Sequence, residues 1–131
     1  MATNTAGSTA RELATQQTHF LRKQIDGEDG NQTVTMGVVP SGTIVTRIYT
    51  ATRNSGGLTG GTATLSFGTS ASPALYFAAS TTPATTTGLN LVTIITAGGS
   101  VLTADTTLVA VVAGTPTGGS IDVVIEYVPN I

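Results

Sequence analysis

Apolar and polar side chains alternate with a period of two over much of this chain. The alternation is clearest over residues 120–128, which read SIDVVIEYV. Because successive side chains of a β-strand point to opposite faces, this period predicts half-buried strands. In this segment we expect four apolar side chains to point inward, namely Ile121, Val123, Ile125 and Tyr127. The acidic residues Asp122 and Glu126 are expected to point outward.

Strand signals recur along the chain, and turn-forming residues separate them. We expect strands at residues 18–25, 32–39, 43–53, 62–68, 74–78, 89–96, 106–113 and 120–128. Turn signals at intervals of roughly 8–12 residues are typical of an all-β sandwich or barrel. The segment 106–113 (TTLVAVVA) is almost entirely apolar, which predicts a strand buried on both faces. The predicted fold class is all-β: an antiparallel sandwich or barrel of about eight strands.

Alternation within three of these strands also assigns side chains to faces. One face of the strand at 32–39 should carry Val34, Met36 and Val38, and the opposite face Thr33 and Thr35. In the strand at 43–53, one face should carry Ile44 and Ile48, and the opposite, wetter face Val45, Arg47, Tyr49, Ala51 and Arg53. In the strand at 62–68, the inward residues should be Ala63, Leu65 and Phe67.

The first 17 residues differ from the rest of the chain. They are small and polar, and Leu13 is their only sizeable apolar residue. The stretch ARELATQQ has the composition of a short helix but no apolar stripe with which to dock. Two interpretations remain open, a frayed terminus and an arm that lies on a partner. We therefore divide the chain into an N-terminal arm, residues 1–17, and a β-sandwich domain, residues 18–131.

Composition and charge narrow the range of functions. The 131 residues include no cysteine, which excludes a disulfide framework, a thiol nucleophile and thiolate metal sites. Five basic residues and a net charge of −2 make no basic stripe, so nucleic-acid binding is not expected. No window approaches roughly 18 consecutive apolar residues, and the N-terminus lacks the pattern of a secretory signal. We expect a chain made in a cytoplasm, without a membrane span.

Catalytic constellations are scarce in this sequence. His19 is the only histidine, and it lies in a strand-like stretch beside Phe20, which favours a packing or surface role over that of a base. Residues 68–72 (GTSAS) approach a nucleophile elbow, but Ser72 stands where the motif needs glycine. No glycine-rich stretch is followed by Lys-Ser or Lys-Thr, so no phosphate-binding loop is predicted. We expect no enzymatic activity and no cofactor.

Two groups of carboxylates could bear chemistry. Asp26, Glu28 and Asp29 lie close in sequence, but their spacing does not match a calcium-binding EF-hand loop, and a solvated turn is the favoured interpretation over a cation site. Asp122 and Glu126 share one face of a strand, but four residues of strand separate them by about 13 Å, too far for glycoside hydrolysis. A glycosylation sequon at residues 31–33 is interpreted as accidental without a secretion signal.

Several short stretches, taken in order, carry a resemblance. Residues 38–45 (VVPSGTIV) lead into a strand, and residues 64–69 (TLSFGT) end the next one. Residues 102–106 (LTADT) precede an apolar strand, and residues 114–119 (GTPTGG) precede the final one. In this order they resemble the small β-sandwich virion proteins of tailed bacteriophages, over about residues 18–128. Such proteins often carry acidic residues in the loop at 70–73. This loop is uncharged, which puts a cation site there in doubt.

The resemblance implies a structural protein of the virion with an antiparallel, jelly-roll-like β-sandwich and an extended N-terminal arm. Such proteins serve as capsid decoration (cement) proteins, which often form homotrimers at threefold positions of the shell and bind the major capsid protein. It implies a location on the capsid exterior and an N-terminal arm that reaches a neighbouring subunit or the shell. We take as candidate partner-binding residues Thr3, Thr5, Arg11, Leu13 and Arg22. The alternative is a head-fibre or tail-fibre module that binds host-surface glycans, although few aromatic residues are present to stack on sugars.

A long uncharged segment fits a covering role. No charged residue occurs from residue 54 to residue 104. Because removing charges from water is costly, uncharged Thr, Ser, Ala and Gly allow close approach between copies. We therefore expect this segment to lie partly at contacts with other subunits or with the shell.

Overall fold

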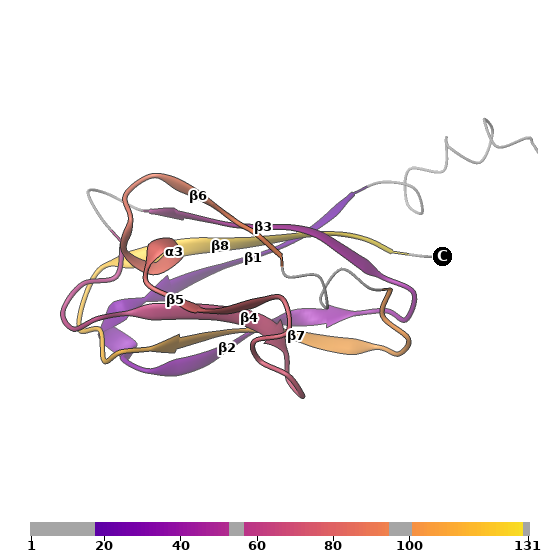
Figure 1. The fold of residues 1–131 in the computed structure, drawn as a ribbon, viewed down its shortest axis with the longest axis horizontal. Coiled ribbons are helices and arrows are strands. Elements are labelled where there is room, and N and C mark those ends of the chain that lie inside the picture. Colours follow the sequence, from indigo (N-terminus) through magenta and orange to yellow (C-terminus); the bar gives the residue numbers. More distant parts are fainter. Residues whose placement is uncertain (1–17, 53–56, 95–100, 130–131) are drawn as a thin grey trace, which may run out of the picture.

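Two β-sheets pack face to face, with short loops at both ends (Figure 1). The structure is a computed structural model and describes residues 18–52, 57–94 and 101–129. Its strands are β1 (His19–Asp26), β2 (Gln32–Val39), β3 (Ile44–Thr52), β4 (Thr64–Thr69), β5 (Phe77–Ser80), β6 (Leu89–Val92), β7 (Thr106–Ala113) and β8 (Ser120–Val128). Two short helical turns join them, η1 (Gly27–Asp29) and α3 (Thr82–Thr85). The expected all-β sandwich is confirmed.

The strand order follows from rolling up one long hairpin. The first sheet has the order β1-β8-β3-β6, and the second sheet has the order β2-β7-β4-β5. Every strand of the first half of the chain pairs antiparallel with its counterpart in the second half: β1 with β8, β2 with β7, β3 with β6 and β4 with β5. Two further antiparallel pairs, β3 with β8 and β4 with β7, complete the sheets. This is the eight-stranded jelly-roll arrangement.

The core lies between the two sheets and is made of their inward-facing aliphatic and aromatic side chains. The predicted inward residues Ala63, Leu65 and Phe67 are fully buried there. Ile121, Val123 and Ile125 of β8 are buried against them, as predicted, and Tyr127 is half-buried at the end of the strand. In β7, the central strand of the second sheet, Leu108, Val109 and Ala110 are all buried. The prediction of a strand covered on both faces is therefore confirmed.

A β-bulge in β2 makes the predicted facing of its last residues wrong. The pairing of β2 with β7 shifts register between Thr35 and Gly37, which leaves Met36 as an extra residue. An extra residue reverses the alternation beyond it, because side chains repeat every two residues. Val38 is accordingly exposed, with 66% of its surface accessible, and Val39 is fully buried in its place.

A second bulge corrects the faces of β3 in the same way. The register with β8 shifts between Val45 and Arg47. Val45 therefore points inward and is buried together with Ile48, whereas Ile44 points outward and is 38% exposed. The grouping of Ile44 with Ile48 was wrong. The prediction that Arg47 and Tyr49 share an outer face is confirmed.

Three other expectations need correction or fall outside the described residues. The strand expected at 74–78 begins later, at Phe77, because residues 72–76 form a turn in which Leu75 N–H bonds to the Ser72 carbonyl. The strand expected at 89–96 ends at Val92, and residues 95–100 lie outside the described residues. Arg53 and the predicted arm, residues 1–17, also lie outside them.

The glycine-rich loops are explained by close approach of backbones at one end of the sandwich. A Cβ atom on Gly27 would lie 1.9 Å from the Gly118 carbonyl oxygen, and one on Gly114 would lie 1.8 Å from the Thr62 carbonyl oxygen. Gly27 N–H donates to Gly119 O, and Thr62 N–H donates to Gly114 O. These loops interlock so tightly that only glycine fits, and they hold the ends of both sheets together.

Candidate interaction surface

The outer face of the first sheet gathers most of the exposed large apolar side chains. Cross-strand pairing places its residues in rows. One row holds Phe20, Glu126 and Arg47; the next holds Arg22, Val124, Tyr49 and Leu91; the third holds Gln24, Asp122, Ala51 and Leu89. Ile44 and Val128 pair at the end of the same face. We call this set of side chains the outer face.

Four side chains make the outer face unusually apolar for a solvent-facing sheet. Phe20 is 58% exposed, Leu89 65% and Leu91 67%, and Ile44 is also exposed. The structure describes two further exposed large apolar residues, Val38 and Val101, and both lie elsewhere. Exposed large apolar side chains gathered on one face of a protein that otherwise buries them indicate an interaction site.

Two ion pairs cross the outer face. The Arg22 guanidinium donates from Nε to Asp122 Oδ2 at 3.0 Å, and its Nη2 contacts the same oxygen. Arg47 Nη1 lies 3.8 Å from Glu126 Oε2. In each pair the carboxylate comes from the central strand β8 and the arginine side chain is the more exposed partner. The four charges balance, so the face carries no net charge.

Asp122 points outward as predicted but is not solvated. Its exposed fraction is only 5%, and the neighbouring Val124 is 9% exposed. The long side chain of Arg22 lies against the carboxylate and shields it, and β1 and β3 flank it on both sides. The centre of the outer face is therefore already packed, and its accessible apolar groups lie toward the edges.

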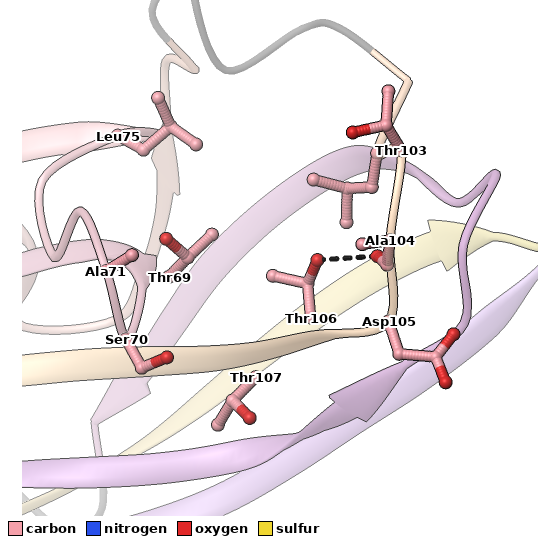
Figure 2. A pocket seen from close by; sticks show the side chains of 10 residues that line it. Thr69, Ser70, Ala71, Leu75, Thr103, Ala104, Asp105, Thr106 and Thr107 are labelled. Carbon is pink, nitrogen blue, oxygen red and sulfur yellow. Dashed lines mark hydrogen bonds between the residues drawn. The ribbon is translucent and has the colours of Figure 1, made fainter.

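A pocket of about 370 Å³ lies at the opposite end of the sandwich from the interlocked loops. Residues after β4 form one wall and the segment that leads into β7 forms the other (Figure 2). Its lining is rich in hydroxyl groups, and Thr106 Oγ1 donates to the Ala104 carbonyl within it. Asp105 is its one charged lining residue; its carboxylate turns away from Thr69 and Leu75 and accepts from Ser41 N–H at 2.9 Å.

The predicted site residues have different outcomes. Arg22 lies on the outer face with its side chain 66% exposed, where it can reach a partner. Thr3, Thr5, Arg11 and Leu13 lie outside the described residues. The outer-face leucines of β6 were missed as individual site residues. The leucines alternate in the sequence LNLV, which indicates that both lie on one face of the strand. Alternation alone does not show whether that face points to the core or to the outside.

The histidine and the acidic cluster singled out from the sequence both lie in the described part of the structure. His19 packs against Tyr127 with ring centroids 5.5 Å apart. Glu28 and Asp29 form the exposed turn η1, and Asp26 Oδ1 accepts from Gln24 Nε2. Within residues 18–52, 57–94 and 101–129, no three acidic or histidine side chains converge as metal ligands would. In the same ranges no helix is long and apolar enough to cross a membrane.

Tyr76 is a buried titratable residue whose pKa is clearly shifted. It is 1% exposed, and burial raises its pKa above the ordinary value of 10.0. Its hydroxyl has no hydrogen-bond partner within the described part of the chain. It lies in the core and is not part of either surface feature.

Three solved structures share this fold. A chain of the cyanophage Pam1 capsid asymmetric unit is 21% identical with a TM-score of 0.60, covering 86% of this chain and 85% of that one. A chain of the capsid of Ralstonia phage GP4 is 20% identical with a TM-score of 0.59, covering 87% and 85%. A chain of the acidic stable capsid of Helicobacter pylori bacteriophage KHP30 is 12% identical with a TM-score of 0.55, covering 84% and 85%.

At the level of sequence alone, no protein-family model matches the chain and no curated protein matches it. The structural likeness at these identities establishes the fold. The chain has the two-sheet sandwich fold of chains found in the capsids of three phages.

Proposed function

We propose that this chain is a structural protein of a phage virion, and specifically a capsid decoration (cement) protein that binds the outside of the head shell. The observation that carries the proposal is the coverage of the structural likeness. About 85% of this chain aligns with 85% of each of three chains from phage capsid structures. The neighbours are therefore small sandwiches of similar length and not domains of much larger chains. A small separate chain in a capsid fits a protein added to the shell.

The surface chemistry supports this role. The described residues offer a sparsely charged, threonine-rich exterior, an outer face whose two ion pairs balance beside exposed apolar side chains, and no converging set of potential metal ligands. Binding to a repeating shell needs only modest affinity at each site when copies are linked, because an oligomer engages several sites at once. In this proposal the protein forms a homotrimer that contacts the major capsid protein.

The arm, residues 1–17, is the proposed contact with the shell. It joins the sandwich at β1, next to Phe20 and Arg22 of the outer face. Small side chains such as those of Thr3 and Thr5 allow the backbone to pair closely with a partner strand, and Arg11 and Leu13 supply one charge and one apolar anchor. The proposal expects the virion exterior as the location and expects no enzymatic activity.

Removal of residues 1–17 tests the shell contact directly. Purified full-length and truncated proteins would be mixed with undecorated heads of the same phage, and the fraction that sediments with the heads measured. We expect the truncated protein to keep its β-sheet circular dichroism and to bind at least about tenfold more weakly. The full-length double variant Arg11→Ala with Leu13→Ala should fall between the two. Equal binding of all three proteins would contradict the role of the arm.

One observation favours a second candidate, a head-fibre or tail-fibre module for host-surface glycans. The pocket at Thr69 and Thr103 is lined by hydroxyls and one carboxylate, which are groups that bind sugars. Its lining includes no aromatic side chain on which a sugar ring could stack. Saturable binding on a glycan array that is lost in Thr103→Val would favour this function, and an empty array would favour the decoration function.

A further inference from the structure

Three of the four exposed apolar side chains of the outer face form two groups at opposite edges of the sheet, and the fourth, Ile44, lies at the end of the internal strand β3. Leu89 and Leu91 lie on β6, at one edge, and Phe20 lies on β1, at the other. The strands β8 and β3 separate the two groups, so they stand about 14 Å apart at the usual spacing of strands. No single side chain or narrow segment can cover both groups.

The strip between the two groups, formed by β8 and β3, has its carboxylates already paired with arginines. Asp122 and Glu126 each already have an arginine partner on the same face, so covering this strip leaves no carboxylate without a counter-charge. Breaking a buried pair is costly, whereas burying an intact pair against a neutral surface is far less so. Tyr49 and Val124 fill the space between the pairs.

The two edge strands of this sheet, β1 and β6, differ in how strongly their charges oppose contact with another chain. β1 carries Arg22, Lys23 and Asp26, and charged residues on an edge strand discourage unwanted pairing. β6 has a strand neighbour on one side only within the described residues, and its sequence LNLV contains no charge. The whole segment from residue 54 to residue 104 is also uncharged. The β6 edge therefore meets no charge repulsion when a similar surface approaches.

We propose that the outer face is the interface between copies of this chain, with Leu89 and Leu91 of one copy packed against Phe20 of the next. The inference deepens the proposed function and rests on its homotrimer, for which it names the contacting residues. Because each copy in the proposed homotrimer meets two neighbours, we infer a head-to-tail contact, and such contacts close into a ring when the rotation allows it. In a ring, each copy uses both edges of the same face.

A second copy fits the outer face better than the arm of the same chain does. The arm has one sizeable apolar residue, Leu13, which cannot cover two separated groups. In a ring, the copy on one side brings its Phe20 to the leucines, and the copy on the other side brings its leucines to Phe20. This contact also opposes the exposed Arg22 with the uncharged β6 edge of its neighbour, so no like charges face each other.

Cross-linking through introduced cysteines tests the pairing, and the natural absence of cysteine makes each introduced thiol unique. Three single variants are made in the full-length chain: Phe20→Cys, Leu91→Cys and, as a control on the second sheet, Val38→Cys. Val38 is 66% exposed and Leu91 is 67% exposed, so the two are matched in accessibility. Each variant, and co-expressed pairs, would be treated with a short bis-maleimide and resolved by denaturing electrophoresis.

We expect Phe20→Cys and Leu91→Cys to cross-link with each other when co-expressed and to give little product alone. A chain that carries both substitutions should yield a covalent product of three times the 13.1 kDa chain mass. Val38→Cys should give no cross-link with either. Efficient cross-linking of Leu91→Cys with itself would overturn the head-to-tail contact, because it indicates a two-fold pairing of β6 edges. Absence of any product would also overturn the proposal.

Particle mass gives a second readout that does not depend on cross-linker geometry. Leu91→Asp should reduce the mass in solution to that of a single chain and leave the circular dichroism unchanged, whereas Val38→Asp should leave both unchanged. An unaltered mass for Leu91→Asp, or a single-chain mass for the unmodified protein, would overturn the interface. Failure of an intact ring to bind heads would count against the proposed function and leave this interface standing. Head binding by a protein that makes no cross-link would overturn this interface and leave the proposed function standing.

Discussion

A glycine can be required for two reasons, an unusual backbone conformation or the close approach of another backbone. Two glycines of the interlocked loops show the difference. Gly30 has a φ of 69° and no heavy atom within 4 Å of where a Cβ would lie. Gly114 has a φ of 88°, and its Cβ would lie 1.8 Å from the Thr62 carbonyl oxygen. Both need a left-handed backbone, which favours glycine, but only Gly114 must also let another backbone pass.

We predict that Gly114→Ala destabilises the fold far more than Gly30→Ala. A left-handed backbone costs a residue with a Cβ about 1–2 kcal/mol, and this cost applies to both variants. At Gly114 the overlap with Thr62 forces the loops apart, so the total loss should exceed about 3 kcal/mol. Urea denaturation followed by circular dichroism measures both values. Equal losses would mean that the loops do not interlock as described.

Tyr76 is the second residue whose environment has a measurable consequence. Its hydroxyl is buried, has no partner among the described residues and has a raised pKa. In the unfolded chain a tyrosine loses its proton near pH 10, but in the folded chain it keeps it to higher pH. The unfolded state is therefore favoured progressively as the pH rises above about 10, and the folded state keeps its full stability below that pH.

We predict that Tyr76→Phe keeps or improves stability near neutral pH and weakens the loss at alkaline pH. Removing an unsatisfied buried hydroxyl should raise the free energy of unfolding by up to about 1 kcal/mol. Between pH 9 and 11, stability of the unmodified protein should fall more steeply than that of the variant. These pH limits are about one unit either side of the usual tyrosine pKa. Parallel slopes would show that Tyr76 does not titrate differently in the folded state.

Among the elements, the sequence predicted the facing of side chains reliably only in strands that contain no β-bulge. β2, β7 and β8 all have the predicted bounds, but the predicted facing of side chains holds throughout only in β7 and β8, because neither contains an extra residue. β2 and β3 contain bulges at Met36 and Thr46. Gly37, a glycine inside the strand pattern, was a sign of the first bulge, but no residue beside Thr46 signals the second. A bulge depends on how the strand meets its partner, so the alternation of one strand cannot reveal it. That is why Val38 and Ile44 were assigned to the wrong faces.

The β2 bulge gives a paired prediction on adjacent residues. Val39→Ala should lower the free energy of unfolding by about 2 kcal/mol, because it removes two methyl groups from a fully buried side chain. Val38→Ala should change it by less than about 0.5 kcal/mol, since Val38 is mostly exposed. Chemical denaturation of the two variants measures the difference. The opposite ranking would place the register shift elsewhere.

The candidate surface was only partly predictable for a related reason. Arg22 could be singled out as one of few basic residues, and the uncharged segment from 54 to 104 pointed to contacts through β6. Asp122 points outward as expected, but it is buried because Arg22, a hundred positions away on β1, lies over it. Such shielding depends on which strands become neighbours, and a single chain's pattern does not specify strand order.

At the scale of the whole molecule, the two ends, the core and the outer face have different structural roles. One end is fixed by interlocked glycine loops, and the other bears the pocket (Figure 2). The core between the sheets makes a rigid platform, and the outer face presents apolar groups at its two edges. This division suits a protein that covers and holds a larger assembly, because rigidity and surface complementarity matter there more than reactive groups do.

The most direct test of this account is cryo-electron microscopy of purified virions that contain the protein. The account predicts density for the sandwich at regular positions over the head lattice, as rings in which outer faces of neighbouring copies meet and residues 1–17 extend onto the shell. Density confined to the tail, to a single vertex or to a fibre tip would contradict the decoration function and would favour host adsorption instead.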